Sequence, residues 1–356
     1  MIKVVIVEDS PVAREFLTYI LTSDPAIQVV GIASNGVEAL AVVARLRPDV
    51  ITMDIHMPVM DGFEATRRIM ETVPTPIVIV SGSTTATEVA STFRAHEVGA
   101  LAVVLRPPGM DHAAFEASEK ELLRTVKLMS EIKVVRRIPR TARKPAPASA
   151  LVAPVSPTVV KIQLVAIGAS TGGPPALQKI LSGLPADFSV PILIVQHIAA
   201  GFVTGFAKWL AGTSGFPVRV ASHGEVPLPG HVYVAPDSVH MGVARGPFIV
   251  LSDHPAENGL RPSVAYLFRC VAQVLGPGAV GVLLTGMGRD GADELKMMKE
   301  RGAITVAQDK ESSIVHGMPG EAIKLGAATH ILLPEEIASL LVALVKNGTG
   351  DTHEYR

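Results

Sequence analysis

Short apolar runs alternate with amphipathic stretches along the first 125 residues of the chain. The apolar runs have the length of buried strands, and the stretches between them repeat apolar positions at helical spacing. This alternation predicts a (βα)5 domain of the α/β class, with helices on both faces of a parallel sheet. The predicted strands span residues 3–7, 28–33, 49–53, 76–80 and 101–105, and the predicted helices include 13–21, 37–46 and 63–71.

The same alternation returns between residues 161 and 346. It predicts a second α/β domain, again with a doubly wound parallel sheet. The predicted strands span residues 164–167, 192–196, 232–235, 248–251, 280–285, 303–307 and 330–332. The predicted helices span residues 176–181, 201–210, 263–274, 291–300, 320–325 and 334–345.

The region between the two patterns has neither periodicity. Six basic residues from Lys133 to Lys144 occur without an acidic one, and prolines interrupt an alanine-rich stretch that follows. Such a segment cannot form a core, and its prolines favour extended conformations. The charges alone would also fit a nucleic-acid-binding arm, but a position between two folded patterns favours a linker. We expect domains at 1–125 and 161–346, a linker at 126–160 and a frayed tail at 347–356.

Composition narrows the class of protein. The chain has 32 basic and 33 acidic residues, so no overall field argues for nucleic acid. Its one cysteine, Cys270, cannot form an internal disulfide, which favours a reducing cytoplasm. The N-terminus is charged too early for a signal peptide, and no run of about 18 uncharged apolar residues predicts a membrane span.

Polar residues end four of the five strands predicted in the first domain. Glu8 and Asp9 follow the first strand, Asp54 the third, Ser81 the fourth and Arg106 the fifth. Each alone would be an ordinary solvated group, but ligands collect at this edge of a parallel sheet. Three carboxylates that converge there need a cation, and hard oxygen ligands suit Mg²⁺. A carboxylate held against Mg²⁺, with a hydroxyl and a cation nearby, can accept a phosphoryl group.

With these residues, the first domain resembles the receiver domain of response regulators. The resemblance implies that Asp54 takes a phosphoryl group from a histidine kinase. It also implies that Mg²⁺ is held by Glu8, Asp9, Asp54 and the backbone carbonyl of His56, and that Ser81 contacts the phosphoryl oxygens.

Two positions depart from that family. Arg106 stands where the family has lysine, and Val103 stands where it usually has an aromatic switch residue. Arginine keeps the charge but has a wider, planar head. Phosphorylation at Asp54 is still expected, with weaker coupling to a conformational switch.

In the second domain, the sequence Gly168-Ala169-Ser170-Thr171-Gly172-Gly173 follows an apolar run and precedes a helix. Its Gly-x-Ser-x-Gly pattern matches a nucleophile elbow, in which a sharp turn exposes the serine hydroxyl. Backbone N–H groups at the start of the helix can stabilise developing negative charge. A phosphate-binding loop or a simple glycine turn is the alternative for this short motif.

Two further polar residues follow strands of the second domain. His197 comes after strand 192–196, and Asp290 lies in Gly286-Met287-Gly288-Arg289-Asp290-Gly291 after strand 280–285. A serine, a histidine and an aspartate at adjacent strand ends can form a hydrolytic triad. The order Ser, His, Asp along the chain differs from that of typical α/β-hydrolases. Alone, His197 would be a packed histidine and Asp290 a helix N-cap.

The same glycines allow a rival interpretation. Gly286-x-Gly288-x-x-Gly291 is a dinucleotide-binding fingerprint, and Asp309 follows about 18 residues later, as that motif requires. It predicts a phospho-regulated nucleotide-binding module without hydrolase activity. This hypothesis leaves Ser170 and His197 unexplained, whereas the triad uses all three loops.

The whole chain resembles the chemotaxis protein-glutamate methylesterase/protein-glutamine glutaminase family. The resemblance rests on the receiver, the proline-rich linker and the loops of Ser170, His197 and Asp290. It also rests on Gln196 and on the sequences Arg261-Pro262-Ser263-Val264 and Gly317-Met318-Pro319. Ala265 departs from the family, which often has aspartate there.

The resemblance implies that Ser170 is the nucleophile, His197 the base and Asp290 the group that orients it. Thr171 and Met287 would lie beside the oxyanion, with backbone N–H groups as donors. The implied substrates are γ-glutamyl methyl esters and glutamines of cytoplasmic chemoreceptor helices, giving glutamate plus methanol or ammonia. Mg²⁺ is implied for the receiver and no cofactor for the hydrolase domain. The unphosphorylated receiver would cover the catalytic face.

Overall fold

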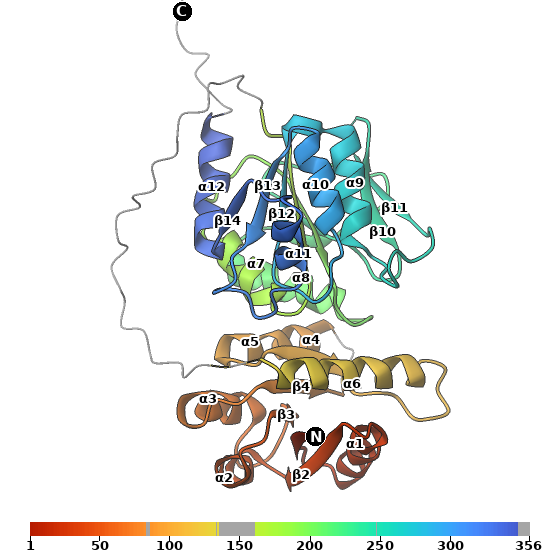
Figure 1. Ribbon diagram of the computed structural model, residues 1–356, viewed down its shortest axis with the longest axis vertical. Coiled ribbons are helices and arrows are strands. Elements are labelled where there is room, and N and C mark those ends of the chain that lie inside the picture. Colours follow the sequence, from red (N-terminus) through yellow and green to blue (C-terminus); the bar gives the residue numbers. More distant parts are fainter. Residues whose placement is uncertain (83–85, 133, 135–160, 247, 348–356) are drawn as a thin grey trace, which may run out of the picture.

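The computed structural model describes residues 1–82, 86–132, 134, 161–246 and 248–347, which form two domains (Figure 1). Most of the predicted linker, and the predicted tail beyond residue 347, lie outside the described residues. None of the helices within these ranges is long and apolar enough to cross a bilayer.

The first domain is a five-stranded parallel sheet of order β2-β1-β3-β4-β5. Helices α1 and α6 pack on one face, and α2, α3 and α5 pack on the other. The predicted (βα)5 arrangement is confirmed, although α6 continues past residue 125. The strands are β1 (Ile2–Val7), β2 (Ile27–Ala33), β3 (Val50–Met53), β4 (Ile77–Ser81) and β5 (Ala102–Leu105). The helices are α1 (Pro11–Ser23), α2 (Gly36–Leu46), α3 (Gly62–Thr72), α4 (Ala86–Phe93), α5 (Ala95–Val98) and α6 (Phe115–Ser130).

The second domain has a seven-stranded parallel sheet of order β14-β13-β12-β6-β7-β9-β8. Helices α7, α8 and α12 cover one face, and α9, α10 and α11 cover the other. The strands of the sheet are β6 (Leu164–Ala169), β7 (Ile192–Gln196), β8 (Val218–Val220), β9 (Val232–Val234), β12 (Ala279–Leu283), β13 (Ile304–Gln308) and β14 (His330–Leu332). The helices are α7 (Gly173–Ser182), α8 (Val203–Ser214), α9 (Val264–Val274), α10 (Ala292–Glu300), α11 (Met318–Lys324) and α12 (Pro334–Asn347).

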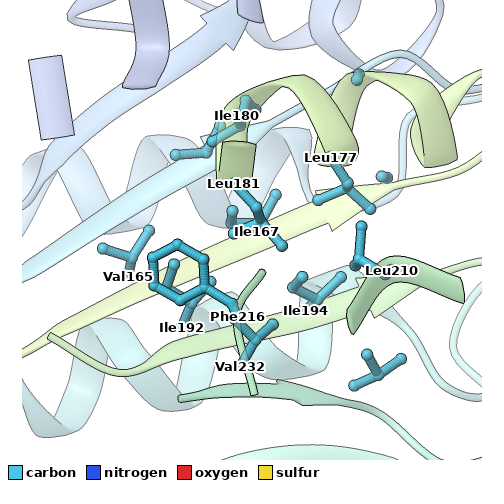
Figure 2. Close-up of a cluster of buried hydrophobic side chains, with 14 of the residues drawn as sticks. Val165, Ile167, Leu177, Ile180, Leu181, Ile192, Ile194, Leu210, Phe216 and Val232 are labelled. Atoms are coloured by element: carbon cyan, nitrogen blue, oxygen red, sulfur yellow. The ribbon is translucent and has the colours of Figure 1, made fainter. Parts of the chain in front are cut away.

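The core of this domain lies on both sides of its central strands. All six residues of β6 are buried, because strands covered by helices on both faces are apolar along their whole length. Figure 2 shows Val165 and Ile167 of β6 packed with Leu177 and Leu181 of α7. This packing fixes the end of β6, where Ser170 follows.

Two strands of the second domain were not predicted. β8 has only three residues, and β10 (His240–Ala244) contains a histidine and a glycine that weaken the strand pattern. The predicted strand at 248–251 is present as β11 (Phe248–Ser252), but it pairs with β10 in a separate antiparallel hairpin. The apolar pattern identified a strand there without showing to which sheet it belongs.

The two domains contact each other through α4, α5 and α6 of the first domain (Figure 1), together with Val103 and Leu105 of its edge strand β5. The ring of Phe93, on α4, lies 6.1 Å from Phe202, 5.4 Å from Phe206 and 5.6 Å from Trp209, measured between centroids. Trp209 Nε1 donates a hydrogen bond to Glu97 Oε1 at 3.3 Å. An aromatic cluster therefore joins the domains.

Candidate functional site

Ser170 lies between β6 and α7, in the sharp turn that its glycines predict. Gly172 has a φ of 80°, which glycine adopts without strain. Gly173 begins α7, and a Cβ atom there would lie 2.1 Å from Gln196 Oε1. The backbone N–H of Ser170 donates to Thr285 O at 3.0 Å. The turn places Ser170 at the carboxyl edge of the sheet, half-buried.

The loop after β12 approaches the same turn. A Cβ atom on Gly286 would lie 2.7 Å from Ser170 Cβ and 2.3 Å from Met318 Sδ, so only glycine fits there. The hydroxyl of Thr285 lies 2.9 Å from the carbonyl oxygen of Thr171. These contacts fix the loops of Ser170 and Met287 relative to each other.

His197 and Asp290 meet beside this turn. His197 Nε2 lies 3.0 Å from Asp290 Oδ2, and both side chains are largely buried. The distance suits an ion pair once the imidazole has taken up a proton, although the contact is not aligned as a hydrogen bond. Because Nε2 faces the carboxylate, Nδ1 is the ring nitrogen that remains for a proton from a serine.

Asp290 is held at the N-terminus of α9. Its carboxylate accepts hydrogen bonds from Ser263 Oγ at 3.0 Å, from the Val264 N–H at 2.7 Å and from the Ala265 N–H at 3.1 Å. Burial disfavours the charge, but His197 and these backbone donors outweigh burial and lower the pKa of Asp290. The carboxylate is therefore ionised at neutral pH. Ala265 contributes its backbone N–H, which any residue except proline would supply at this position.

The remaining groups of the predicted site line one cavity of about 440 Å³. Ser170, Thr171, His197 and Met287 contribute to its wall, opposite a face of α6. Within the described residues, Ser170 Oγ makes no hydrogen bond, and the backbone N–H groups of Thr171 and Met287 have no acceptor. A hydroxyl, an imidazole and two unused donors can together bind and attack a carbonyl group. Since β12, β6 and β7 are adjacent, the sheet itself brings these loops together.

The geometry disfavours the nucleotide-binding hypothesis. The first turn of α10 carries Asp293 and Glu294, whose charges would repel a pyrophosphate at that helix end. A Cβ atom on Gly291 would lie 2.4 Å from Val264, so this glycine serves close packing between α9 and its neighbour. The Asp309 carboxylate accepts a hydrogen bond from Ser312 within its own loop. The fingerprint residues thus have structural roles here.

The predicted phosphorylation site is assembled in the first domain. Carboxylate oxygens of Glu8, Asp9 and Asp54 lie within 4.8 Å of one another. They line a pocket of about 720 Å³ together with His56 and Ser81, and Arg106 is also in its wall. Burial and the neighbouring Asp54 carboxylate raise the pKa of Glu8, and burial raises the pKa of Asp54. Hard oxygen ligands that repel one another suit a divalent cation such as Mg²⁺.

Arg106 reaches into this pocket from the end of β5. Its Nη1 atom lies 3.5 Å from Glu8 Oε2, and its backbone N–H donates to Ser81 O at 2.7 Å. A Cβ atom on Gly82 would lie 2.4 Å from Arg106 Nη2, so a glycine makes room for the wide guanidinium. Arginine is therefore accommodated where lysine was expected from the resemblance.

Sequence reasoning assigned no role to several buried polar residues around Ser170. Gln196, Ser263 and Thr285 are each no more than 4% exposed. Gln196 donates to the backbone, Ser263 donates to Asp290, and Thr285 connects three loops. The feature of the sequence that could have identified these three residues is a polar side chain at the end of an otherwise apolar strand or at the start of a helix.

Comparisons with known proteins find a family match for each of the two domains. A family model described as CheB methylesterase matches residues 165–341, and one described as response regulator receiver domain matches residues 4–113. The protein-glutamate methylesterase/protein-glutamine glutaminase of Nitrosospira multiformis is 59% identical over 97% of this chain and 97% of its own. A relative of the same name from Syntrophus aciditrophicus is 56% identical over 97% of this chain and 98% of its own.

A solved structure gives the same result for the second domain. The crystal structure of the Thermotoga maritima CheB methylesterase catalytic domain is 38% identical, with a TM-score of 0.51. It covers 52% of this chain and 100% of that chain. Fold and site thus define a response regulator whose receiver precedes an α/β domain of the esterase type. The chain belongs to the protein-glutamate methylesterase/protein-glutamine glutaminase family.

Proposed function

We propose that this protein is a phosphorylation-controlled hydrolase of chemoreceptors. It removes methyl groups from glutamyl methyl esters and deamidates glutamines, giving glutamate plus methanol or ammonia. The observation that carries this proposal is the contact of His197 with the buried Asp290 beside the unengaged hydroxyl of Ser170. The names of the relatives supply the substrate class.

Hydrolysis begins at Ser170. Its Oγ attacks the ester carbonyl carbon while His197 Nδ1 takes the hydroxyl proton, and Asp290 stabilises the imidazolium that forms. The backbone N–H groups of Thr171 and Met287 donate to the developing oxyanion. The tetrahedral intermediate expels methanol, which receives the proton from His197, and leaves an acyl-enzyme. Water then attacks the acyl group with His197 as base, which releases glutamate and restores Ser170.

Control resides in the receiver. Asp54 accepts a phosphoryl group from a histidine kinase, with Mg²⁺ held by Glu8, Asp9, Asp54 and the backbone carbonyl of His56. The ion neutralises charge on the phosphoryl group and on the carboxylates when bound. The crowded carboxylates and their raised pKa values support this assignment. Ser81 and Arg106, in the wall of the same pocket, contact the phosphoryl oxygens.

The domain arrangement supports inhibition by the unphosphorylated receiver. A face of α6 forms one wall of the cavity over Ser170, and Arg124 Nη2 lies 3.5 Å from Met287 Sδ. A receptor helix cannot enter while α6 is there. Phosphorylation at Asp54 shifts the equilibrium toward an open form. We place the enzyme in the cytoplasm, because the phosphodonor and the substrate helices act there and Cys270 is a free thiol.

Methanol release from methylated receptor membranes tests the proposal. Ser170→Ala should reduce the rate at least about 10³-fold, because it removes the nucleophile. Ser182→Ala, on the exposed end of α7, is the matched control and should keep the wild-type rate. Substantial methanol release by folded Ser170→Ala protein would refute the assignment of the nucleophile.

A further inference from the structure

The side-chain amide of Gln196 joins the two loops that carry Ser170 and His197. Gln196 is the last residue of β7 and is 4% exposed. Its Nε2 donates one hydrogen bond to the carbonyl oxygen of Ser170 and one to that of His197, both at 2.8 Å. An amide nitrogen has two protons, so both are used.

The orientation of this amide is determined by its surroundings. If the amide were flipped, its oxygen would face two carbonyl oxygens and repel both. In the observed orientation Oε1 faces Gly173, where a Cβ atom would lie 2.1 Å away. Oε1 is buried and has no hydrogen-bond partner among the described residues. An unpaired buried acceptor destabilises the folded state. An apolar residue would therefore be expected at this position unless the two donated hydrogen bonds have a role.

The backbone provides only part of the connection between the loops. The His197 N–H donates to Ala169 O at 2.9 Å, which pairs the ends of β7 and β6. Beyond that point the strands separate, and Ser170 turns into α7. The Gln196 amide is the contact that continues across this gap. Its loss would let the Ser170 turn move relative to His197 without unpairing the sheet.

We propose that Gln196 is a positioning residue, whose two donated hydrogen bonds set the separation between Ser170 and His197. This inference rests on the proposed function of those two residues. Both amide protons are taken by backbone carbonyl oxygens, so the side chain acts through the backbone of Ser170 and of His197. Because proton transfer from serine to histidine needs hydrogen-bond reach, a shift of about 1 Å can cost on the order of 10²-fold in rate.

Gln196→Glu tests the role through pH, because the two side chains have the same shape. A protonated carboxyl can donate one hydrogen bond, whereas the ionised form donates none and repels both carbonyl oxygens. Burial beside those oxygens raises the pKa of the introduced carboxyl above its usual value of about 4.3. The kcat ratio of variant to wild type should therefore fall as pH rises from about 5 to 8, reaching roughly 10- to 100-fold loss. KM should change little.

Two further variants separate positioning from a general loss of stability. Gln196→Met has similar length and no donor, so its kcat should fall by a similar factor at every pH. Thr305→Val removes a buried hydrogen bond from Thr305 Oγ1 to Ala327 O, at 2.7 Å on β13, away from the cavity. It should lower Tm and leave kcat unchanged, which shows that destabilisation alone does not reduce the rate.

A second measurement avoids the receptor substrate. The rate at which a fluorophosphonate labels Ser170 in the full-length chain should fall in parallel with methanol release in both Gln196 variants. Wild-type labelling and a pH-independent kcat ratio near one would overturn the inference. A failure of the proposed function is recognised separately, because the wild type would then release no methanol, or Ser170→Ala would release it at an undiminished rate.

Discussion

Phe93→Ala is the sharpest test of control by the receiver. Phe93 is 1% exposed, and its ring packs among Phe202, Phe206 and Trp209 of the second domain. Truncation removes these contacts from the closed form, while the open form has already lost them. The substitution should therefore shift the equilibrium toward the open form without a phosphodonor.

The size of the shift follows from the burial. Removing a buried phenylalanine from a core costs about 3–5 kcal/mol. Part of that cost is intrinsic to the receiver, so we assign roughly 2 kcal/mol to the contact between domains. This amount multiplies the ratio of open to closed enzyme about 30-fold, since each 1.4 kcal/mol is tenfold. Basal methanol release should rise by up to that factor, with the fully phosphorylated rate as the ceiling.

The assay has an internal reporter. Trp209 is the single tryptophan of the chain, and it is 4% exposed at this contact. Opening should shift its fluorescence to longer wavelength, both in Phe93→Ala and in wild type given Mg²⁺ and a small phosphodonor. Tyr19→Ala, on α1 and 58% exposed, is the control and should change neither signal. If Trp209 becomes exposed while methanol release stays at the basal rate, the receiver does not inhibit by covering the site.

Three other substitutions have defined outcomes. Asp290→Asn should lower kcat about 10³- to 10⁴-fold. The variant should also have a lower Tm than the wild type. Because the pKa of Asp290 is lowered in the folded state, this difference in Tm should shrink as pH falls through that pKa. Asp54→Asn should raise Tm by a few degrees at pH 7 in EDTA. Because the pKa of Asp54 is raised in the folded state, its ionisation destabilises the fold at any pH above the pKa that this carboxyl has in the unfolded chain. That gain should vanish in acid, and Mg²⁺ should stabilise the wild type more than the variant. Val59→Asn should add roughly 1 kcal/mol to the free energy of unfolding measured in urea, because Val59 has a φ of 69° and is 86% exposed. Val12→Asn, at a position on helix α1 that is 77% exposed, is the control and should not add stability.

Periodicity predicted most of the fold because both sheets are buried on two faces. Strands such as β6 and β12 are entirely apolar, so they stand out between amphipathic helices. It failed at β8, which has only three residues, and at β10, where a histidine and a glycine interrupt the apolar pattern. Local patterns also do not encode pairing, which explains why the strand near residue 250 was found but its partner was not.

The candidate site was predictable for a related reason. Parallel strands bring their carboxyl ends to one edge, so Ser170, His197 and Asp290 could be placed together from their positions alone. The sequence contained no information on which imidazole nitrogen would face Asp290. It also did not reveal that Gln196 bridges the loops, because a glutamine at a strand end has many possible partners. Such roles depend on side-chain direction, which three-dimensional packing decides.

The position of Val103 bears on how strongly phosphorylation controls the enzyme. β5 carries Arg106 into the phosphorylation pocket at one end, while Val103 lines a cavity of about 70 Å³ between the domains, together with Ser170 and His197. A β-branched side chain has few rotamers and no polar atom, so it cannot swing toward the pocket as an aromatic switch residue could. A signal from Asp54 must then reach the interface through displacement of β5 and its loops. Because packed strands resist small displacements, this route predicts weaker activation than a rotating aromatic side chain would give.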